Sequence, residues 1–162
     1  MDENITHQLT HQWDLWTHDL DSTDWSLSGY QKIFTFHSIE DCWIMINQIS
    51  DWNLGMYYIM KSGYLPIWED EKNINGGAWT FKCLKTTADK IWIDMLCALV
   101  GSTLVNDPDF LTGLSISPKA KFATIRVWTS HIDSQQYQYL NTALINFHEA
   151  RFMSNRETLK NS

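Results

Sequence analysis

The stretch PIWEDEKNINGGAW, residues 66–79, sets Trp68 directly before three acidic residues and ends on a second tryptophan after a Gly-Gly pair. An indole in such a turn-rich loop usually lies too far from the hydrophobic core to be buried in it. An exposed indole face attracts cations, and the next side chain, Glu69, is an acceptor-only carboxylate. The segment therefore favours a flat, positively charged ligand. The alternative is that the acidic run is only a solvated turn.

A second loop tryptophan, Trp25, lies in DLDSTDWSLSG, residues 19–29. Two indoles from two loops can clamp a flat ring, and stacking contributes about 1–3 kcal/mol per base. A cationic ring adds about 2 kcal/mol when it is desolvated. The Glu69 carboxylate matches the adjacent N1–H and N2–H donors of guanine. Guanine methylated at N7 is flat and cationic and carries those donors, so it fits this pair of loops.

Composition limits the class of protein. The chain has 162 residues, enough for one domain with a sizeable core, and a net charge of −7, which argues against binding a long nucleic-acid backbone. Its nine tryptophans are more than such a core usually needs. Cys42, Cys83 and Cys97 lie far apart, and we expect free, buried thiols. No signal peptide or membrane-spanning run is seen, so we expect a cytoplasmic protein, with the nucleus as the alternative.

Hydrophobic periodicity predicts an α+β fold. The expected strands are 13–18, 30–37, 56–61, 64–68, 78–84, 111–117, 122–129 and a last short one near 150–157. The expected helices are 38–49, 86–101 and about 134–149. No regular alternation of strands and helices appears, which favours an antiparallel sheet with helices on one side. We expect a single domain over 1–162, with 1–11 as a loose lead-in and 157–162 as a loose tail.

A basic segment, SPKAKFATIRVW, residues 117–128, supplies candidate phosphate ligands. Lys119 and Lys121 fall in its loop. In the strand that follows, Thr124, Arg126 and Trp128 share one face. Cations that converge beside an aromatic side chain suit a phosphorylated ligand, whereas a solvated basic loop beside an edge strand is the simpler alternative.

The helix at 86–101 has more apolar surface than one sheet can cover. One stripe is Trp92, Met95, Leu96 and Leu99, and a second is Ile93, Cys97 and Val100. Either the helix is deeply buried or its second stripe contacts a partner. On the helix at 38–49, Trp43 with Ile39 is expected beside that stripe, which is typical of a groove for an amphipathic helix. The alternative for Trp43 is a place in the core.

Taken in order, these segments resemble the translation initiation factor 4E family, the proteins that bind the 7-methylguanosine cap of mRNA. The resemblance covers roughly residues 7–150, and its matching segments are HQWDLW, DWSLS, SIEDCW, PIWEDEKNINGGAW, IWIDMLCALVG and VWTS. It implies a curved antiparallel sheet of about eight strands with three helices on its convex face and the cap in its concave face. It also implies a monomeric binding protein for translation initiation or its regulation, with no enzymatic activity, cofactor, metal or membrane association.

The resemblance assigns roles to residues of the cap site. Trp25 and Trp68 would stack on the methylated guanine, Glu69 would bind the guanine edge, and Trp128 would touch the methyl group. Lys119 and Lys121 would bind phosphates. The chain departs from the family at Ala78 and Thr124, where a basic residue is usual, and we expect Arg126 to replace one lost cation.

The resemblance also implies a protein partner. Scaffold and repressor partners of the family carry a Tyr-x-x-x-x-Leu-hydrophobic helix. Here it would dock on Ile39, Glu40, Trp43, Ile93, Asp94, Cys97 and Val100, with Glu40 and Asp94 as an acidic rim. His7-Gln8 stands where the family has a His-Pro pair that receives the tyrosine, and Cys97 is smaller than the usual leucine. We therefore expect weaker binding than is typical.

Three other interpretations stay open. His7, His11 and His18 have a spacing that metal sites use, but no thiolate lies near them and we expect no metal. Glu69 with Asp24 or Asp107, beside tryptophan platforms, would suit a glycosidase-like protein or carbohydrate-binding module. The third interpretation is an adaptor that keeps the partner surface without cap binding. The cations favour a phosphorylated ligand over a neutral sugar.

Overall fold

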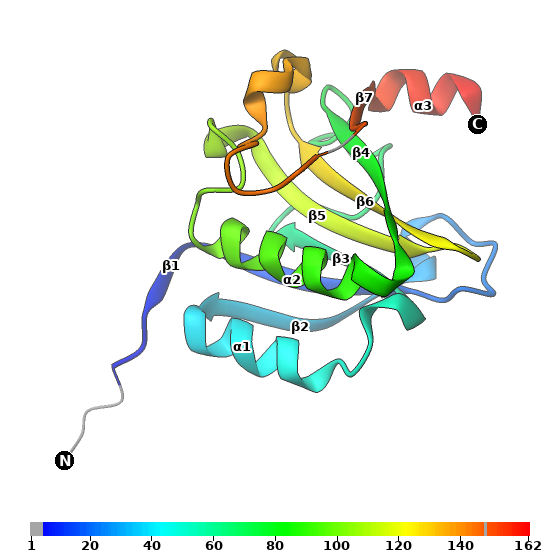
Figure 1. Cartoon of the computed structure of the whole chain (residues 1–162). Coiled ribbons are helices and arrows are strands. Elements are labelled where there is room, and N and C mark those ends of the chain that lie inside the picture. Colours follow the sequence, from blue (N-terminus) through cyan, green and yellow to red (C-terminus); the bar gives the residue numbers. More distant parts are fainter. Residues whose placement is uncertain (1–4, 148) are drawn as a thin grey trace.

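A computed structural model describes residues 5–147 and 149–162, and its centre is one seven-stranded antiparallel sheet in the order β2-β1-β3-β5-β6-β4-β7 (Figure 1). The strands are β1 Gln8–His18, β2 Tyr30–Ser38, β3 Met56–Lys61, β4 Gly77–Leu84, β5 Leu111–Pro118, β6 Phe122–Thr129 and β7 Arg151–Ser154. The α-helices are α1 Ile39–Gln48, α2 Lys85–Val100 and α3 Asn155–Asn161. Short 3₁₀ helices are η1 Leu27–Gly29, η2 Trp52–Leu54, η3 Pro108–Phe110, η4 Ile132–Gln135 and η5 Tyr137–Tyr139.

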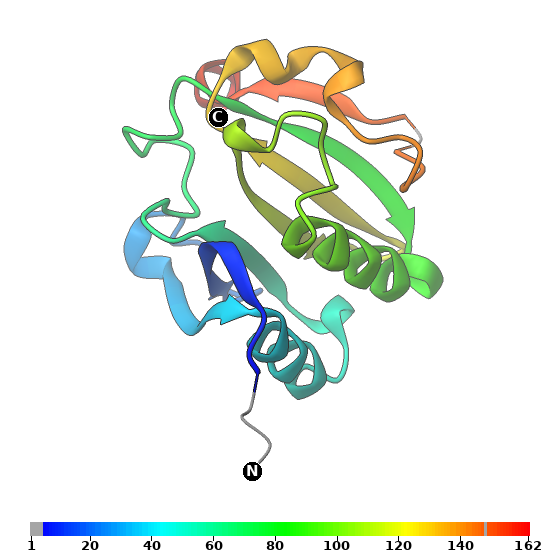
Figure 2. The same ribbon diagram turned by 90° about the vertical axis from the view of Figure 1, so that its left-hand side faces the viewer.

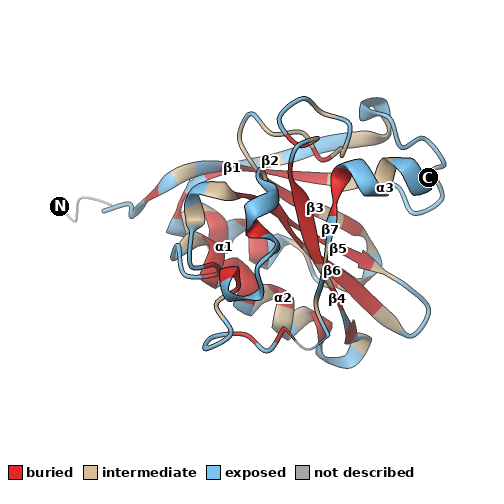
Figure 3. Ribbon diagram, turned by 90° about the horizontal axis from the view of Figure 1, so that it is seen from above, coloured by how far each residue is buried: buried red, intermediate tan, exposed pale blue. Residues whose placement is uncertain are grey.

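The sheet has two different faces. Helices α1 and α2 cover one face, and buried side chains fill the space between them and the strands (Figures 1 and 3). Side chains alternate along a strand, so Trp13 and Leu15 enter this main core while Trp16 points to the opposite face. Trp79 and Phe81 of β4 likewise join the main core.

Local hydrogen bonds mark the start of α1 and the end of α2. Ser38 caps α1, because its hydroxyl accepts a hydrogen bond from the Asp41 backbone N–H. Helix α2 begins after Leu84 with no side-chain cap. At its other end the Gly101 N–H donates to the Cys97 carbonyl. The first apolar stripe of α2 is buried under the sheet, which leaves the second stripe toward the outside.

The opposite face of the sheet is more open. Five buried side chains form a second, smaller cluster there: Trp16, Met56, Tyr58, Met60 and Trp128. The loops at 19–29 and 62–76 project on this side, away from α1 and α2 (Figure 2). The molecule therefore presents a helix-covered face and a face bordered by two tryptophan-bearing loops.

The α+β antiparallel fold is confirmed, with seven strands rather than eight. Residues 64–68, predicted as a strand, form part of a loop, because the Leu65 and Ile67 carbonyls accept hydrogen bonds from the Asn73 side chain and not from a neighbouring strand. Residues 134–149 were predicted as a helix, and this was wrong for the described part. Their backbone instead bonds to another loop: Asn106 N–H donates to the Tyr139 carbonyl, and Asn141 N–H to the Leu104 carbonyl.

The third helix of the structure differs from the predicted one both in its residue range and in its position relative to the sheet. It is α3, at 155–161, and its Asn155 and Thr158 share a cavity with Trp68, so it lies on the open side rather than under the helix-covered face. Residues 157–161, expected as a loose tail, are thus helical. Residues 8–11, expected in a loose lead-in, belong to β1, while residues 1–4 lie outside the described part.

Two further observations concern expected absences. Within 5–147 and 149–162, no helix has the length and apolar character needed to span a bilayer, and no group of three or more potential ligands gathers to hold a metal ion.

The three cysteines are free, but Cys97 is exposed, contrary to the expectation that all three would be buried. It belongs to the outward stripe of α2.

Candidate functional site

A cavity of about 430 Å³ lies on the open face of the sheet, between the two tryptophan-bearing loops. It brings together residues from distant parts of the chain. Its lining consists of Trp25, Tyr30, Met56, Tyr58, Pro66, Ile67, Trp68, Glu69, Ser117, Lys119, Arg126, Trp128 and Ser162. Both predicted stacking tryptophans, the predicted guanine-binding carboxylate and two of the three predicted phosphate ligands are therefore neighbours. Lys121 is exposed and is not part of this lining.

Trp25 is 51% exposed and is held from behind by a buried histidine. The His18 ring stacks on the Trp25 indole with centroids 4.2 Å apart and planes 4° apart. His18 Nδ1 lies 2.8 Å from the Asp19 carbonyl oxygen, and Nε2 lies 2.8 Å from that of Asp24. Both partners only accept hydrogen bonds, so an imidazolium satisfies both contacts and a neutral ring satisfies one. The second indole face is left for a ligand.

The loop that carries Trp25 is closed on itself by Asp24. Its carboxylate accepts hydrogen bonds from the hydroxyls of Ser26 and Ser28 and from the Ser26 backbone N–H. These bonds hold the pKa of Asp24 below its usual range. A Cβ at Gly29 would fall 1.8 Å from the Asp24 carbonyl oxygen, so only glycine permits this close turn.

The Trp68 loop has no secondary structure and is organised by one buried side chain. The Asn73 amide nitrogen donates to the Leu65 carbonyl at 2.7 Å and to the Ile67 carbonyl at 2.8 Å. These bonds fix the chain just before Trp68. Trp68 is half-buried and Glu69 is exposed, so both can reach a ligand in the cavity.

The C-terminal helix fastens the far end of the same loop. The Asn155 amide donates to the Asn73 carbonyl at 2.7 Å, and the Arg156 guanidinium donates to Asn75 Oδ1 at 2.7 Å. A Cβ at Gly76 would fall 1.9 Å from the Thr129 carbonyl oxygen, which explains the glycine where the loop meets β6. Contacts within the loop, with α3 and with the end of β6 therefore hold the Trp68 loop in place.

The floor of the cavity is aromatic. Trp128 is buried, and its indole N–H donates to Ser115 Oγ at 2.9 Å. Tyr58 meets Trp128 edge to face, with centroids 6.3 Å apart, and Tyr30 meets Tyr58 at 5.3 Å. Burial raises the pKa of both tyrosines, so they are neutral at pH 7.

Arg126 is the half-buried cation of the cavity. It shares a face with Trp128, as predicted, and no carboxylate of the described residues forms an ion pair with it. Burial lowers the pKa of Arg126, an effect that the nearby phenols of Tyr58 and Tyr30 oppose. Partial desolvation makes an anionic ligand a favourable partner for this guanidinium.

The predicted partner residues lie on the helix-covered side. Trp43 is 46% exposed and Ile39 is 39% exposed. On α2, Cys97 is exposed, whereas Ile93 and Val100 are half-buried. These apolar side chains from two helices form a surface that no described residue covers completely.

Two residues expected in the rim are engaged within the protein. The His7 ring lies 2.6 Å from a Glu40 carboxylate oxygen, and the His7 backbone N–H donates to the other at 2.9 Å. These bonds lower the pKa of Glu40 to about 2. Gln8 pairs with Ser38 in the β1–β2 ladder, and Asp94 accepts from Lys90 one helical turn away at 2.6 Å.

Chemically, this arrangement can hold a flat ring and an attached anion. Two indoles border the space, and a free carboxylate offers acceptors at its edge. Lys119 and Arg126 then supply positive charge for phosphates.

Comparisons with known proteins identify the family of the chain. The sequence profile of the family described as Eukaryotic initiation factor 4E matches residues 8–160. The chain belongs to this family. Eukaryotic translation initiation factor 4E of Xenopus laevis is 30% identical over 142 residues, which cover 83% of this chain and 67% of that protein. The Homo sapiens protein is 30% identical over 140 residues, covering 82% and 64%. The chain thus spans about two thirds of the length of these relatives.

Solved structures give the same result for the fold. Caenorhabditis elegans eIF4E-3, in its complex with the 4E-binding protein Mextli and cap analog, aligns with a TM-score of 0.82 at 23% identity over 96% of each chain. Ascaris suum eIF4E-3, crystallised with m7G cap, aligns with a TM-score of 0.70 at 28% identity, covering 79% of this chain and 76% of that one.

Several residues that shape this initiation factor 4E site were missed in the sequence. His18 was considered only as a metal ligand, and Asn73 was read as part of a turn. The signal for α3 was present: Ser154 and Glu157 have capping-box spacing, and both reciprocal bonds form.

Proposed function

We propose that this protein binds the 7-methylguanosine cap of mRNA, with the methylated guanine stacked between Trp25 and Trp68. Glu69 accepts hydrogen bonds from the guanine edge, and Trp128 contacts the methyl group. Lys119 and Arg126 bind the phosphates, with Lys121 as an outer cation. The function served is translation initiation or its regulation.

One observation carries this proposal: Trp25, Trp68 and Glu69, from two loops far apart in sequence, line a single cavity together with Lys119 and Arg126. Membership of the initiation factor 4E family and the m7G cap bound by the Ascaris suum relative support it. Arg126 is half-buried and pairs with no carboxylate of the described residues, which supports a phosphorylated ligand over a neutral sugar.

Retention on immobilised 7-methyl-GTP compared with polysaccharide tests the choice of ligand. We expect retention on the nucleotide resin and release by free 7-methyl-GTP. Retention on polysaccharide alone would favour a carbohydrate-binding module, and retention on neither would favour an adaptor that acts without the cap.

We also propose a partner surface on the helix-covered side, formed by Ile39, Trp43, Ile93, Cys97 and Val100. An exposed tryptophan beside an aliphatic stripe suits the apolar face of an amphipathic helix, in particular one with a Tyr-x-x-x-x-Leu-hydrophobic motif. The 4E-binding protein seen with the Caenorhabditis elegans relative supports this choice of partner. His7 and Glu40, bonded to each other at the start of α1, border the surface.

A further inference from the structure

Three residues of the cavity between the tryptophan-bearing loops follow one order along β6. Trp128 and Arg126 are successive residues on the open face of the strand, and Lys119 lies in the turn between β5 and β6. Residues two apart on a strand are separated by about 7 Å. A ligand whose base contacts Trp128 therefore meets Arg126 with the groups that follow the base, and meets Lys119 with its outer end.

A tyrosine stands across the sheet from Arg126. Tyr58 of β3 pairs with Ser115 of β5, and Ser115 pairs with Arg126 of β6. Directly opposed residues of antiparallel strands point to the same face, and two strand spacings put the Tyr58 and Arg126 Cα atoms roughly 10 Å apart. The side chain between them is small, and its hydroxyl already accepts the Trp128 indole N–H. The two long side chains thus face the same space above Ser115, and both line the cavity.

The hydroxyl of Tyr58 is available as a donor. Burial raises the pKa of Tyr58, so the phenol keeps its proton at pH 7. A hydrogen bond from Tyr30 and the nearby charge of Arg126 oppose that shift in pKa. Because Tyr30 donates to the Tyr58 oxygen, the Tyr58 proton is left for another acceptor. The two rings also pack edge to face, with centroids 5.3 Å apart, which fixes the direction of the phenol.

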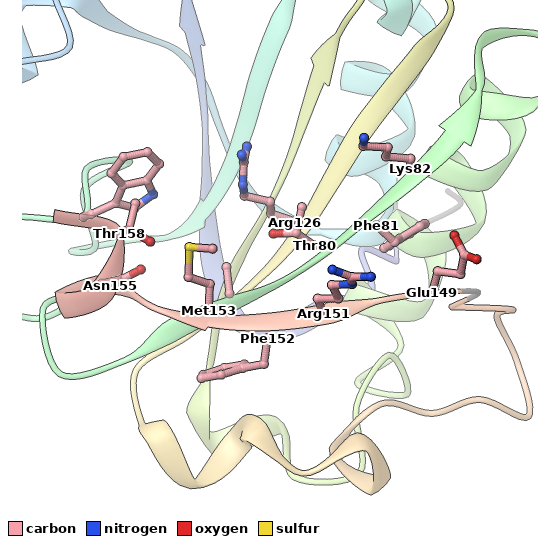
Figure 4. A pocket seen from close by; sticks show the side chains of 12 residues that line it. Thr80, Phe81, Lys82, Arg126, Glu149, Arg151, Phe152, Met153, Asn155 and Thr158 are labelled. Atoms are coloured by element: carbon pink, nitrogen blue, oxygen red, sulfur yellow. The ribbon is translucent and has the colours of Figure 1, made fainter. Parts of the chain in front are cut away.

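The guanidinium of Arg126 is not neutralised from its other side. A second cavity, of about 560 Å³, shares Trp68 and Arg126 with the first. Among the described residues that line it, Glu149 is the one carboxylate, and Figure 4 shows its side chain well apart from that of Arg126. None of the ion pairs of the described residues includes Arg126. A half-buried cation and a phenol donor therefore meet where an anion would be favoured.

We propose that Tyr58 contacts the ligand together with Arg126, and that the two residues bind the phosphate nearest the ribose of a 7-methylguanosine nucleotide. The Tyr58 hydroxyl and the Arg126 guanidinium both donate to the oxygens of this phosphate, and Tyr30 holds the Tyr58 hydroxyl in place. Lys119, which is exposed in its turn, meets only the outer phosphates. The first phosphate therefore contributes more to affinity than the second and third together.

This inference rests on the cap-binding function proposed above, because the contact of the base with Trp128 sets where the first phosphate falls. Four ligands separate the phosphates from one another: 7-methylguanosine and its 5′-mono-, di- and triphosphate. Their affinities are measured by calorimetric titration of the wild type and three variants.

Each variant changes one group. Tyr58→Phe removes a hydroxyl but keeps the ring that packs against Trp128. Lys119→Gln removes the cation of the turn. The matched control is Tyr57→Phe, which removes a hydroxyl from the neighbouring residue of β3, whose ring packs against Trp52 on the helix-covered side.

We expect the wild type to bind 7-methyl-GMP about a hundredfold more tightly than 7-methylguanosine, because two donors reach one anion. The second and third phosphates together should add only about fivefold, as is typical of an exposed cation. Tyr58→Phe should bind all three phosphorylated ligands about tenfold more weakly and 7-methylguanosine as tightly as before. Lys119→Gln should weaken only the di- and triphosphate, and Tyr57→Phe should match the wild type.

Several results would overturn the inference. Tyr58→Phe could lose as much affinity for 7-methylguanosine as for 7-methyl-GMP, could lose affinity only for the di- and triphosphate, or could lose none. A loss of the same size in Tyr57→Phe would have the same meaning. A wild type that binds 7-methylguanosine but gains nothing from the first phosphate would refute this inference alone. A wild type that binds none of the four ligands would instead refute the proposed function.

Discussion

At the residue scale, His18 determines how Trp25 is presented. Its ring covers one face of the indole, and its two nitrogens reach the carbonyl oxygens of Asp19, where the loop begins, and of Asp24, directly before Trp25. The sequence did not reveal this, because a histidine in a strand signals neither a stack nor a partner. The alternation that puts Arg126 beside Trp128 was predictable, since it follows from strand geometry alone.

Two substitutions of His18 separate stacking from hydrogen bonding. His18→Phe keeps an aromatic ring but loses the contacts to Asp19 and Asp24, and we expect affinity for 7-methyl-GTP to fall about fivefold, close to 1 kcal/mol. His18→Ala loses both and should bind more weakly still. His37→Ala, an exposed histidine on β2, is the control. Equal affinity in all four proteins would show that His18 does not position Trp25.

At the scale of elements, the loop at 62–76 depends on one amide. Asn73→Ala leaves the Leu65 and Ile67 carbonyls without their partner, so we expect the free energy of unfolding to fall by about 1–3 kcal/mol. Affinity for 7-methyl-GTP should fall as well, because Trp68 follows directly. Urea denaturation and ligand titration measure the two effects, with the exposed Asn47→Ala on α1 as the control. Unchanged ligand affinity would contradict this role of the loop.

Trp43 of helix α1 is partly exposed, and we have proposed that it contacts a partner rather than the core. Trp43→Ala should change the free energy of unfolding by about 1 kcal/mol or less, because almost half of the side chain is exposed. Pull-down of a Tyr-x-x-x-x-Leu-hydrophobic peptide should be lost while 7-methyl-GTP still binds. Leu144→Ala, another exposed apolar residue, should keep the peptide. A large loss of stability with normal peptide binding would assign Trp43 to the core.

Elements with a strong hydrophobic periodicity could be predicted from the sequence. Segments whose backbone hydrogen bonds go to residues outside the local pattern could not. The residues from Tyr139 to Asn141 bond to the loop at 104–106, including a bridge between Leu140 and Val105, so tertiary pairing replaces the expected helix. Residues 64–68 fail as a strand because Asn73 satisfies their carbonyls. In both segments the partner lies far from the local sequence pattern.

At the scale of the whole molecule, the sheet separates two surfaces. Strand alternation sends Trp13 and Leu15 to the helix-covered side, which carries the proposed partner surface, and Trp16 to the side of the cavity between the tryptophan-bearing loops. Substitutions on one face should therefore leave binding on the other largely intact. The family resemblance supplied the residue roles, and the fold explains how residues from Trp25 to Trp128 meet at one place.

The proposed function depends on recognition of a cationic, methylated guanine by the cavity between the two tryptophan-bearing loops. Titration of intrinsic tryptophan fluorescence with 7-methyl-GTP and with GTP tests it most directly, because the stacking residues are themselves the reporters. We expect saturable quenching by 7-methyl-GTP at concentrations at least tenfold lower than for GTP, since cation–π attraction of about 2 kcal/mol is lost without the methyl group. Equal affinity for both nucleotides would contradict it.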